Sequence, residues 1–270
     1  MTGPSPDRYL ERIGLSPAEF DGPSLETAER LQRAHVRSVP FETLSVTGDP
    51  FDESDEGTGV VLDTAHLYGK VVDRERGGFC FELNGLCHWL LNALGFDVDR
   101  VAARMLGEDG TGTPPANHHS NVVALDGRRY VVDVGMGIPT MRRPTPLDGA
   151  VARDELGYEW RVVESDRPDE EYLTQYRGPD EDEWQDRYLF SDVPRELHYF
   201  AATCDYLQSA PESTFTGDPV VTMATDEGHL RLNPDSLTRI VDGEESEESV
   251  AEEDWHDVLE REFGLRYDPE

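Results

Sequence analysis

One of the three cysteines stands where its thiol could serve as a nucleophile. Cys80 follows Arg76-Gly77-Gly78-Phe79 and precedes a strongly periodic segment, so it is predicted in the first turn of a helix. The free N–H groups and the positive dipole end of a helix N-terminus favour a thiolate, the nucleophilic form of cysteine. Two glycines let the chain turn sharply and let a substrate approach the sulfur. Cys80 is therefore a candidate nucleophile, although the same pattern also fits a small buried core residue.

The other two cysteines carry no comparable signal. Cys87 falls on the apolar stripe of the predicted helix and is expected in the core, and Cys204 has no activating neighbour. Cys80 and Cys87 lie about 10.5 Å apart along a helix axis, too far for a disulfide. The cysteines and the eight histidines show neither zinc-finger nor HExxH spacing, so no metal site is expected.

A nucleophilic cysteine needs a base, and a predicted hairpin supplies one. Asp126-Gly127 is a favoured two-residue turn, and it joins two β-rich runs, Asn121–Leu125 and Arg128–Val134. Counting outward from this turn, Asp133 opposes Ser120, which makes His118 its diagonal neighbour on the same face. Side chains alternate between the faces of a strand, so His119 points the other way. Parity therefore selects His118 as the partner of Asp133.

Asp133 and His118 each have a less interesting interpretation. Asp133 lies in an apolar run, where a carboxylate is costly unless it is paired, but it could also face solvent at a strand end or cap the next turn. His118, beside Asn117, could be an exposed loop histidine. The shared face favours the paired arrangement. Cys80, His118 and Asp133 then form a candidate triad that suits a cysteine hydrolase or an acyltransferase equally well.

The elements that must position this triad change in type along the chain. Residues 1–95 are predicted to be helical, with Ser24 capping a helix that stops before Pro40. The clearest helix follows Cys80 and ends at Gly95. Its apolar positions recur at helical spacing: Leu83, Leu86, Cys87, Leu90, Leu91 and Leu94.

The rest of the chain is predicted to be mostly β, with a final helix. Beyond the hairpin, four further strands are predicted, at Trp160–Val163, Tyr172–Tyr176, Val220–Met223 and Leu230–Leu232. A closing helix is predicted near Ser249–Phe263. The order helical, then β, then mixed indicates three compact parts.

Composition excludes several classes of partner. The 57 acidic and 24 basic residues among 270 give a net charge of −33, and Lys70 is the single lysine. Such a charge argues against nucleic acid or an anionic membrane as the main partner. With no apolar stretch long enough to span a bilayer and no signal-peptide pattern, a cytoplasmic protein is expected. The composition resembles proteins from high-salt cytoplasm, where charge repulsion is screened within roughly 3 Å at about 1 M salt, although a genome bias toward Arg is an alternative.

Four segments of the chain resemble the arylamine N-acetyltransferases. Arg76–Asn84 is similar to that family's active-site signature, and Val39–Leu44 to its N-terminal Pro-Phe-Glu segment. Asp126–Gly137 resembles the hairpin that ends in the family's catalytic Asp, and Tyr206–Phe215 resembles its lid segment. The match runs in order over roughly residues 8–266 and is close to chain-wide.

The resemblance implies a fold and a reaction. The fold is α+β and cysteine-protease-like, with a helical domain (1–96), a β-barrel domain (97–198) and an α/β lid (199–270). The reaction is a ping-pong transfer of acetyl from acetyl-CoA, through a thioester, to an arylamine or arylhydrazine. Cys80 would carry the acetyl group, His118 would hold the proton, and Asp133 would orient the imidazole. No permanent cofactor is implied.

The resemblance also suggests binding residues. The predicted acceptor-site residues are Phe79, Gly135, Met136 and Gly137. The predicted CoA contacts are Tyr206, Ser213 and Thr214. A structural ion pair between Arg76 and Glu42 is implied as well.

Three positions depart from the family pattern. Glu75 replaces a basic residue, and Met136 stands where an aromatic is usual, which puts a flat contact with an aromatic amine in doubt. Glu212 replaces a small polar residue where CoA phosphates are expected. Rival functions are an amide synthase or hydrolase that uses another acyl donor, and a non-catalytic interaction module. The physiological acceptor and the oligomeric state are not predicted.

Overall fold

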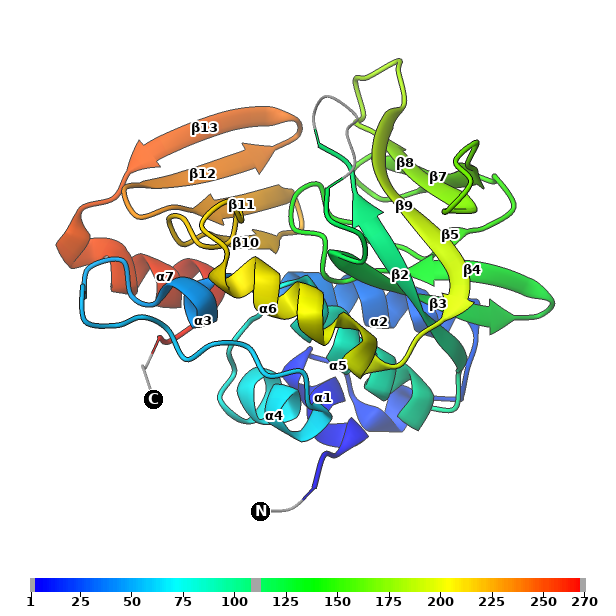
Figure 1. The fold of residues 1–270 in the computed structure, drawn as a ribbon, viewed down its shortest axis with the longest axis horizontal. Helices are drawn as coiled ribbons and strands as arrows, with labels where there is room; N and C mark the ends of the chain where they lie inside the picture. The colour runs from blue at the N-terminus through cyan, green and yellow to red at the C-terminus, as the bar shows by residue number, and fades with distance from the viewer. Residues whose placement is uncertain (1–2, 108–112, 268–270) are drawn as a thin grey trace.

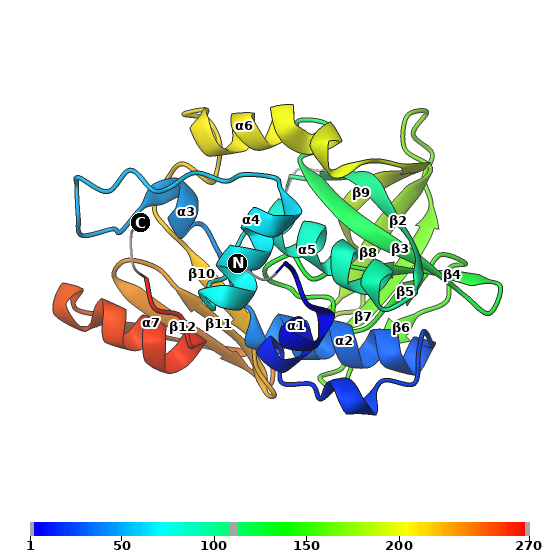
Figure 2. The ribbon, with the colours of Figure 1, turned by 90° about the horizontal axis from the view of Figure 1, so that it is seen from below.

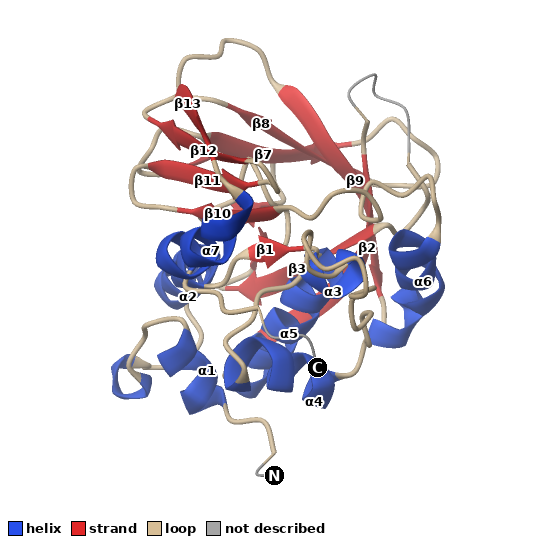
Figure 3. Cartoon of the chain, turned by 90° about the vertical axis from the view of Figure 1, so that its left-hand side faces the viewer, coloured by secondary structure: helices blue, strands red, loops and turns tan. Residues whose placement is uncertain are grey.

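The computed structural model describes residues 3–107 and 113–267. Helices gather on one side of the molecule and two antiparallel sheets on the other (Figure 1, Figure 3). The helices of the N-terminal part are α1 (Pro6–Arg12), α2 (Leu25–Ser38), α3 (Leu44–Thr47), α4 (Thr64–Tyr68) and α5 (Cys80–Ala93). The α+β fold class is confirmed.

Local signals fix the ends of the two long helices as predicted. The Ser24 side chain accepts a hydrogen bond from the Thr27 N–H, 3.1 Å away, and so caps α2. Helix α5 begins at Cys80, and Gly95 follows its last turn with a φ of +86°, a conformation that glycine adopts without strain.

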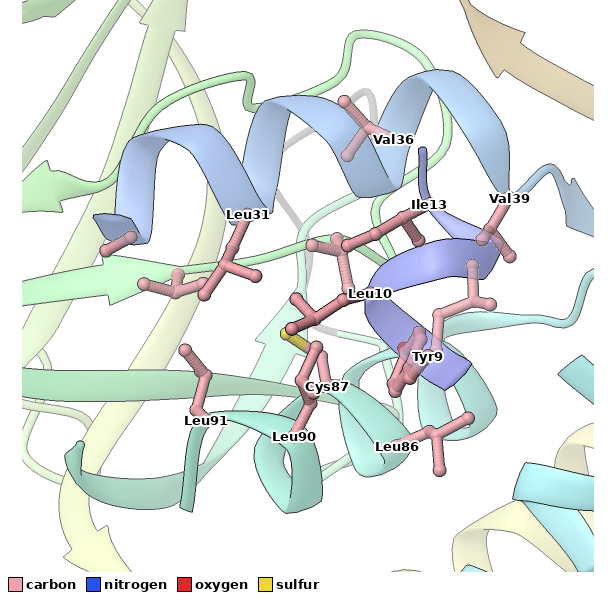
Figure 4. Packing of buried hydrophobic residues seen from close by; sticks show 14 of the residues in the cluster. Tyr9, Leu10, Ile13, Leu31, Val36, Val39, Leu86, Cys87, Leu90 and Leu91 are labelled. Carbon is pink, nitrogen blue, oxygen red and sulfur yellow. The ribbon is translucent and has the colours of Figure 1, made fainter. Parts of the chain in front are cut away.

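The periodic face of α5 forms the largest core. Leu86, Leu90 and Leu91 pack against Leu10 of α1 and Leu31 of α2 (Figure 4). Cys87 lies in the same cluster and is 4% exposed, so it is a core residue as expected. All three cysteines lie in the described ranges and are free thiols. The core thus holds α5, and with it Cys80, against the first two helices.

The middle of the chain forms a sheet of eight strands in the described residues. Their order across the sheet is β5-β4-β3-β2-β9-β8-β7-β6, with every neighbouring pair antiparallel. The strands are β2 (Asp97–Met105), β3 (His118–Leu125), β4 (Arg128–Val132), β5 (Thr145–Pro146), β6 (Ala152–Arg153), β7 (Glu159–Glu164), β8 (Tyr172–Arg177) and β9 (Gln185–Pro194). The edge strands β5 and β6 lie close together. Arg143, just before β5, donates to the carbonyl of Arg153 in β6 at 3.1 Å. The sheet is therefore a nearly closed barrel.

The last part of the chain combines helices with a second sheet. Helix α6 (Ala201–Ser209) precedes strands β10 (Val221–Ala224), β11 (Gly228–Leu232), β12 (Ser236–Val241) and β13 (Glu244–Ser249), and helix α7 (Trp255–Phe263) packs on them. The fifth strand of this sheet comes from the N-terminal part, since β1 (Phe41–Glu42) pairs with β10. Seen from below, α5 lies between α6 on one side and α1 and α2 on the other (Figure 2). The division into three domains stays a prediction.

The prediction of the closing helix was wrong at its start. Residues Glu244–Ser249 form strand β13, and α7 begins only at Trp255, after a short 3-10 turn. All six residues of β13 are exposed and all six are Glu or Ser, so the strand has no apolar alternation by which it could be recognised. Its partner β12 supplies the hydrogen bonds instead.

Two further features concern the described residues alone. No helix in the ranges 3–107 and 113–267 is long and apolar enough to cross a membrane. The same ranges hold no group of three or more His, Cys, Asp or Glu side chains arranged for a metal ion.

Candidate active site

His118 and Asp133 meet at the open end of the β3–β4 hairpin. Leu125 pairs with Arg128 across a turn in which Asp126 and Gly127 both have positive φ, as a type I′ turn requires. This register leaves the His118 Nε2 only 2.7 Å from the Asp133 Oδ2, with both side chains buried. The hydrogen bond predicted from strand parity is present.

Asn84 of α5 holds the other oxygen of Asp133. Its Nδ2 donates to the Asp133 Oδ1 at 2.8 Å and to the His119 carbonyl at 2.7 Å, while its Oδ1 accepts from the Val134 N–H at 2.9 Å. The Gly135 N–H donates to the same Asp133 oxygen at 3.0 Å. Each oxygen of this buried carboxylate therefore has a donor.

These partners decide the charge of Asp133. Burial alone would raise its pKa, but the charge and hydrogen bond of His118 and the donors Asn84 and Gly135 outweigh burial and lower the pKa to about 2. Asp133 is therefore ionised at neutral pH. Because it occupies the Nε2 of His118, the Nδ1 of the ring is the nitrogen left to accept a proton.

Cys80 lies at the start of α5, beside the segments that carry His118 and Asp133. Its Sγ is 3.8 Å from the carbonyl of Asn117, the residue before His118. On the other side, a Cβ at Gly135 would come within 2.9 Å of the Cys80 Cα and carbonyl oxygen. A side chain at 135 would collide with this backbone, so glycine permits the close packing of the two segments.

The helix start does not by itself make Cys80 a thiolate. The side chain is only 3% exposed, and burial raises the pKa of the thiol, with Cys204 and Asp133 adding to the rise. The Phe81 N–H at the start of the helix favours the thiolate but does not compensate. The sequence-based expectation was therefore incomplete, because it counted the helix terminus and not desolvation.

Aromatic side chains and α6 enclose the thiol. Phe79 is fully buried, and its ring lies edge-on to Phe81 at 5.5 Å and to Phe215 at 5.6 Å. Phe81 stacks on His119 at 5.7 Å, so the histidine rejected by parity serves the packing. Cys204 of α6 belongs to the same apolar cluster as Cys80.

The three predicted acceptor-site residues after Asp133 are placed differently from one another. Gly135 lies against Cys80, and Gly137, with a φ of +69°, lies near Thr222 and Phe41. The Met136 side chain is 6% exposed and belongs to the hydrophobic cluster of the barrel. Met136, which stands where the family resemblance has an aromatic, thus has its side chain in the barrel core.

The predicted CoA contacts differ in how free their hydroxyls are. Ser213 is buried, and its Oγ donates to the Leu207 carbonyl at 2.6 Å, which closes the turn after α6. The half-buried Tyr206 donates to Glu212 at 3.2 Å, and Thr214 is exposed. The serine hydroxyl is therefore committed to a structural hydrogen bond, whereas Thr214 faces solvent and Tyr206 packs partly against the apolar cluster around Cys80.

Sequence reasoning missed two polar groups of this region. Asn84 stands four residues after Cys80, on the face of α5 that packs on the barrel, and a polar residue there was the available signal. The single lysine was the other signal. The predicted pair of Arg76 and Glu42 is confirmed at 3.1 Å, and Lys70 joins it, 3.2 Å from Glu42 and 2.8 Å from Glu82.

Comparisons with known proteins decide the family. A family model described as N-acetyltransferase matches residues 24–270. An arylamine N-acetyltransferase of Mycolicibacterium smegmatis is 33% identical over 237 residues, which cover 85% of this chain and 80% of the relative. The chain belongs to the arylamine N-acetyltransferase family. It is therefore an acyltransferase.

One relative of the chain has a name other than arylamine N-acetyltransferase. The proansamycin X synthase of Amycolatopsis mediterranei is 29% identical over 252 residues, 92% of each chain.

Solved structures show the same fold. An arylamine N-acetyltransferase of Bacillus cereus, described as having a unique Cys-His-Glu catalytic triad, matches with a TM-score of 0.86 at 24% identity, over 99% of this chain and 100% of that one. The Mycobacterium marinum enzyme, solved in complex with CoA, matches with a TM-score of 0.81 at 28% identity, over 96% and 92%. Where the Bacillus cereus protein is described with Glu, the residue that bonds His118 here is Asp133.

Proposed function

We propose that this acyltransferase moves an acetyl group from acetyl-CoA to an arylamine or arylhydrazine, through a thioester on Cys80. The observation that carries the proposal is the 2.7 Å bond from His118 to Asp133 beside a helix that begins with Cys80. A thiol, an imidazole and an ionised carboxylate are the parts needed for nucleophilic acyl transfer. The relatives named arylamine N-acetyltransferase support the acceptor class.

The first half-reaction forms the thioester. Burial keeps the Cys80 thiol protonated until His118 accepts its proton at Nδ1, and Asp133 stabilises the resulting imidazolium through Nε2. The sulfur then attacks the acetyl carbonyl, the new S–C bond forms, and the bond between the acetyl carbon and the CoA sulfur breaks. CoA leaves with the proton from His118.

The second half-reaction transfers the acetyl group to nitrogen. The amine attacks the thioester carbon and gives a proton to His118, and the C–S bond to Cys80 breaks as the amide forms. The thiolate recovers the proton. The apolar enclosure by Phe79 and Phe81 excludes water from the intermediate, which favours an amine over hydrolysis.

Binding residues complete the proposal. The donor is supported by the Mycobacterium marinum relative solved with CoA. The half-buried Tyr206 and the exposed Thr214 are proposed as CoA contacts, while Ser213 would act through the turn that its hydroxyl closes. Phe79 and Gly135–Gly137 are proposed to line the acceptor site. The side chain of Met136 would support this lining from the barrel core.

The test is intact-protein mass spectrometry after mixing with acetyl-CoA and no acceptor, in high salt. We expect one added acetyl group, mapped to Cys80 and removed by an arylamine or hydrazine. Cys204→Ser is the matched control, since it removes a buried thiol of the same cluster and should still take up the acetyl group. A folded protein with a reactive Cys80 and no adduct would exclude acetyl-CoA as donor.

An amide synthase or hydrolase with another acyl donor is the second candidate, favoured by the likeness to proansamycin X synthase. The same triad would then accept a bulkier acyl group. Acylation of Cys80 by longer acyl thioesters but not by acetyl-CoA would support the synthase. Release of the acyl group to water, with no amine present and no inhibition by free CoA, would support the hydrolase.

A further inference from the structure

The single lysine of the chain lies in its interior. Lys70 is 3% exposed, in the π-helical turn Gly69–Asp73 that follows α4. Its Nζ lies 2.8 Å and 2.9 Å from the two carboxylate oxygens of Glu82, and 3.2 Å from the Oε1 of Glu42. Lysine is almost never fully buried unless it is paired, so these contacts explain how the position is tolerated.

Lys70 is part of a charge-neutral set of four buried side chains. Glu42 also accepts from Arg76 at 3.1 Å and from the Leu44 N–H at 2.7 Å. Glu42 and Glu82 are each 1% exposed, and Arg76 is 7% exposed. Burial raises the pKa of Glu82 and the charge of Lys70 opposes that rise; with both carboxylates ionised, the two positive and two negative charges cancel. Removing one of them leaves a net charge in a dry environment, where it acts strongly on its neighbours.

One member of the set holds the turn that presents Cys80. Glu82 is the third residue of α5, and its Oε2 accepts from the Phe79 N–H at 3.0 Å. A Cβ at Gly78 would lie 2.8 Å from the same oxygen, so the chain before Cys80 runs directly over this carboxylate. Lys70 donates hydrogen bonds to both carboxylate oxygens of Glu82. The lysine therefore contacts the nucleophile's helix through Glu82.

The charged and titratable groups around Cys80 come from three elements. Glu82 lies on its own helix, Asp133 and His118 come from the β3–β4 hairpin, and Cys204 comes from α6; the charges of Glu82 and Asp133 both raise the pKa of the thiol. Glu82 acts in the same direction on Cys204.

The far side of the set faces the C-terminal segment. The Arg76 guanidinium lies 4.7 Å from the centre of the Tyr267 ring, and Tyr267 donates to Asp55 at 2.5 Å. Lys70, in contrast, donates to Glu82, which is only two residues from Cys80 in the sequence.

We propose that Lys70 is a positioning residue for acyl transfer: it holds Glu82 in place and neutralises it, so that the start of α5 presents Cys80 to His118. The proposal rests on Cys80 being the nucleophile of the proposed function. It assigns a role in the reaction to a residue that touches neither substrate nor the reacting atoms.

The test is a four-protein cycle made of the parent, Lys70→Met, Glu82→Gln and the double variant. The readout is the rate of Cys80 alkylation by iodoacetamide as a function of pH, with the modified peptide quantified by mass spectrometry. Lys70→Met leaves Glu82 uncompensated, so alkylation near neutral pH should fall about tenfold. Glu82→Gln keeps an oxygen for the Phe79 N–H and removes the negative charge, so it should react at least as fast as the parent.

The double variant separates charge from packing. It restores neutrality, and its alkylation rate should return to within about threefold of the parent. A purely structural role of Lys70 would leave the double variant as slow as Lys70→Met, and that result overturns the proposal. So does a parent-like rate for Lys70→Met.

Folding is controlled by thermal melts and by a second buried cation. Arg142 is fully buried and donates to the carbonyls of Thr225 and Gly228, away from α5. Arg142→Met should lower the melting temperature and keep the pH profile of Cys80. If Lys70→Met does not fold, Glu82→Gln still decides, because slower alkylation in that variant overturns the proposal.

Failure of the proposed function gives a different result. Alkylation needs no acetyl-CoA, so a parent that takes no acetyl group while the cycle behaves as expected refutes the donor alone. A parent that is acetylated while the cycle shows no coupling between Lys70 and Glu82 refutes the positioning role alone.

Discussion

Carboxylates behave in opposite ways in two regions of this molecule. At the start of α5, Glu42, Glu82 and Asp133 are buried, and each accepts hydrogen bonds from named donors. In strand β13, the six residues Glu244–Ser249 are all exposed. A buried carboxylate is costly unless it is paired, whereas an exposed one is solvated and contributes little. The net charge of −33 is therefore a property of the surface, while the candidate site depends on a few paired charges.

Among the buried carboxylates, we expect Asp133→Asn to have the largest effect on acyl transfer. An amide can donate to the Nε2 of His118 and so hold the ring in the wrong tautomer, while the geometry stays similar. We expect Cys80 acetylation in a single turnover to slow by about 10³–10⁴-fold, by analogy with serine-protease triads. Rapid-quench mass spectrometry measures this rate. A loss below about tenfold would exclude Asp133 from the triad.

Asn84→Ala should show how much the support of Asp133 contributes. The variant loses the bonds to Asp133, to the His119 carbonyl and from the Val134 N–H. We expect the free energy of unfolding to fall by about 2–4 kcal/mol, because three buried polar groups lose a partner. Urea unfolding measures the change, and single-turnover acetylation should slow as well. An unchanged stability would contradict the network.

The depressed pKa of Asp133 predicts where acid acts. A group whose pKa is lower in the folded protein contributes stability that is present above its unfolded value, near 4, and is lost as the pH falls through its folded value of about 2. The contribution at neutral pH is about 2 kcal/mol. The stability difference between the parent and Asp133→Asn should therefore shrink between about pH 4 and about pH 2. Urea titrations at stepped pH test this, and a constant difference would refute it.

Salt concentration should change how strongly the exposed carboxylates repel acetyl-CoA. Acetyl-CoA is a polyanion, and a surface with a net charge of −33 repels it unless salt screens the charge. Lowering KCl from about 1 M to about 0.1 M should raise the KM for acetyl-CoA several-fold. Circular dichroism recorded in parallel separates binding from unfolding. A flat profile on folded protein would reject the prediction.

Neutralising two exposed glutamates should have the smallest effect. Glu244→Gln and Glu245→Gln together should change the free energy of unfolding by less than about 0.5 kcal/mol in high salt. At low salt the two substitutions together should slightly raise the free energy of unfolding, because repulsion among the remaining acidic side chains is less screened there. Urea unfolding at both salt levels measures the difference. A large loss of stability would mean that β13 depends on these charges.

Much of the site could be predicted because its signals are local. The helix start at Cys80, the Ser24 cap and the Asp126-Gly127 turn each follow from a few neighbouring residues. Strand alternation then placed His118 and Asp133 on one face. The exposed strand β13 was missed, since it has no apolar alternation and is held by pairing with β12.

The amino-acid sequence alone is enough to predict the ends of the long helices, the register of the hairpin and the residue types of the candidate triad. Backbone hydrogen bonding and side-chain periodicity act over a few residues, so they can be read along the chain. Tertiary packing brings Lys70 to both Glu42 and Glu82, places α6 over Cys80 and adds β1 to the last sheet. These contacts join segments far apart in sequence, and packing in three dimensions selects them. Burial, which follows from that packing, also raises the pKa of the Cys80 thiol.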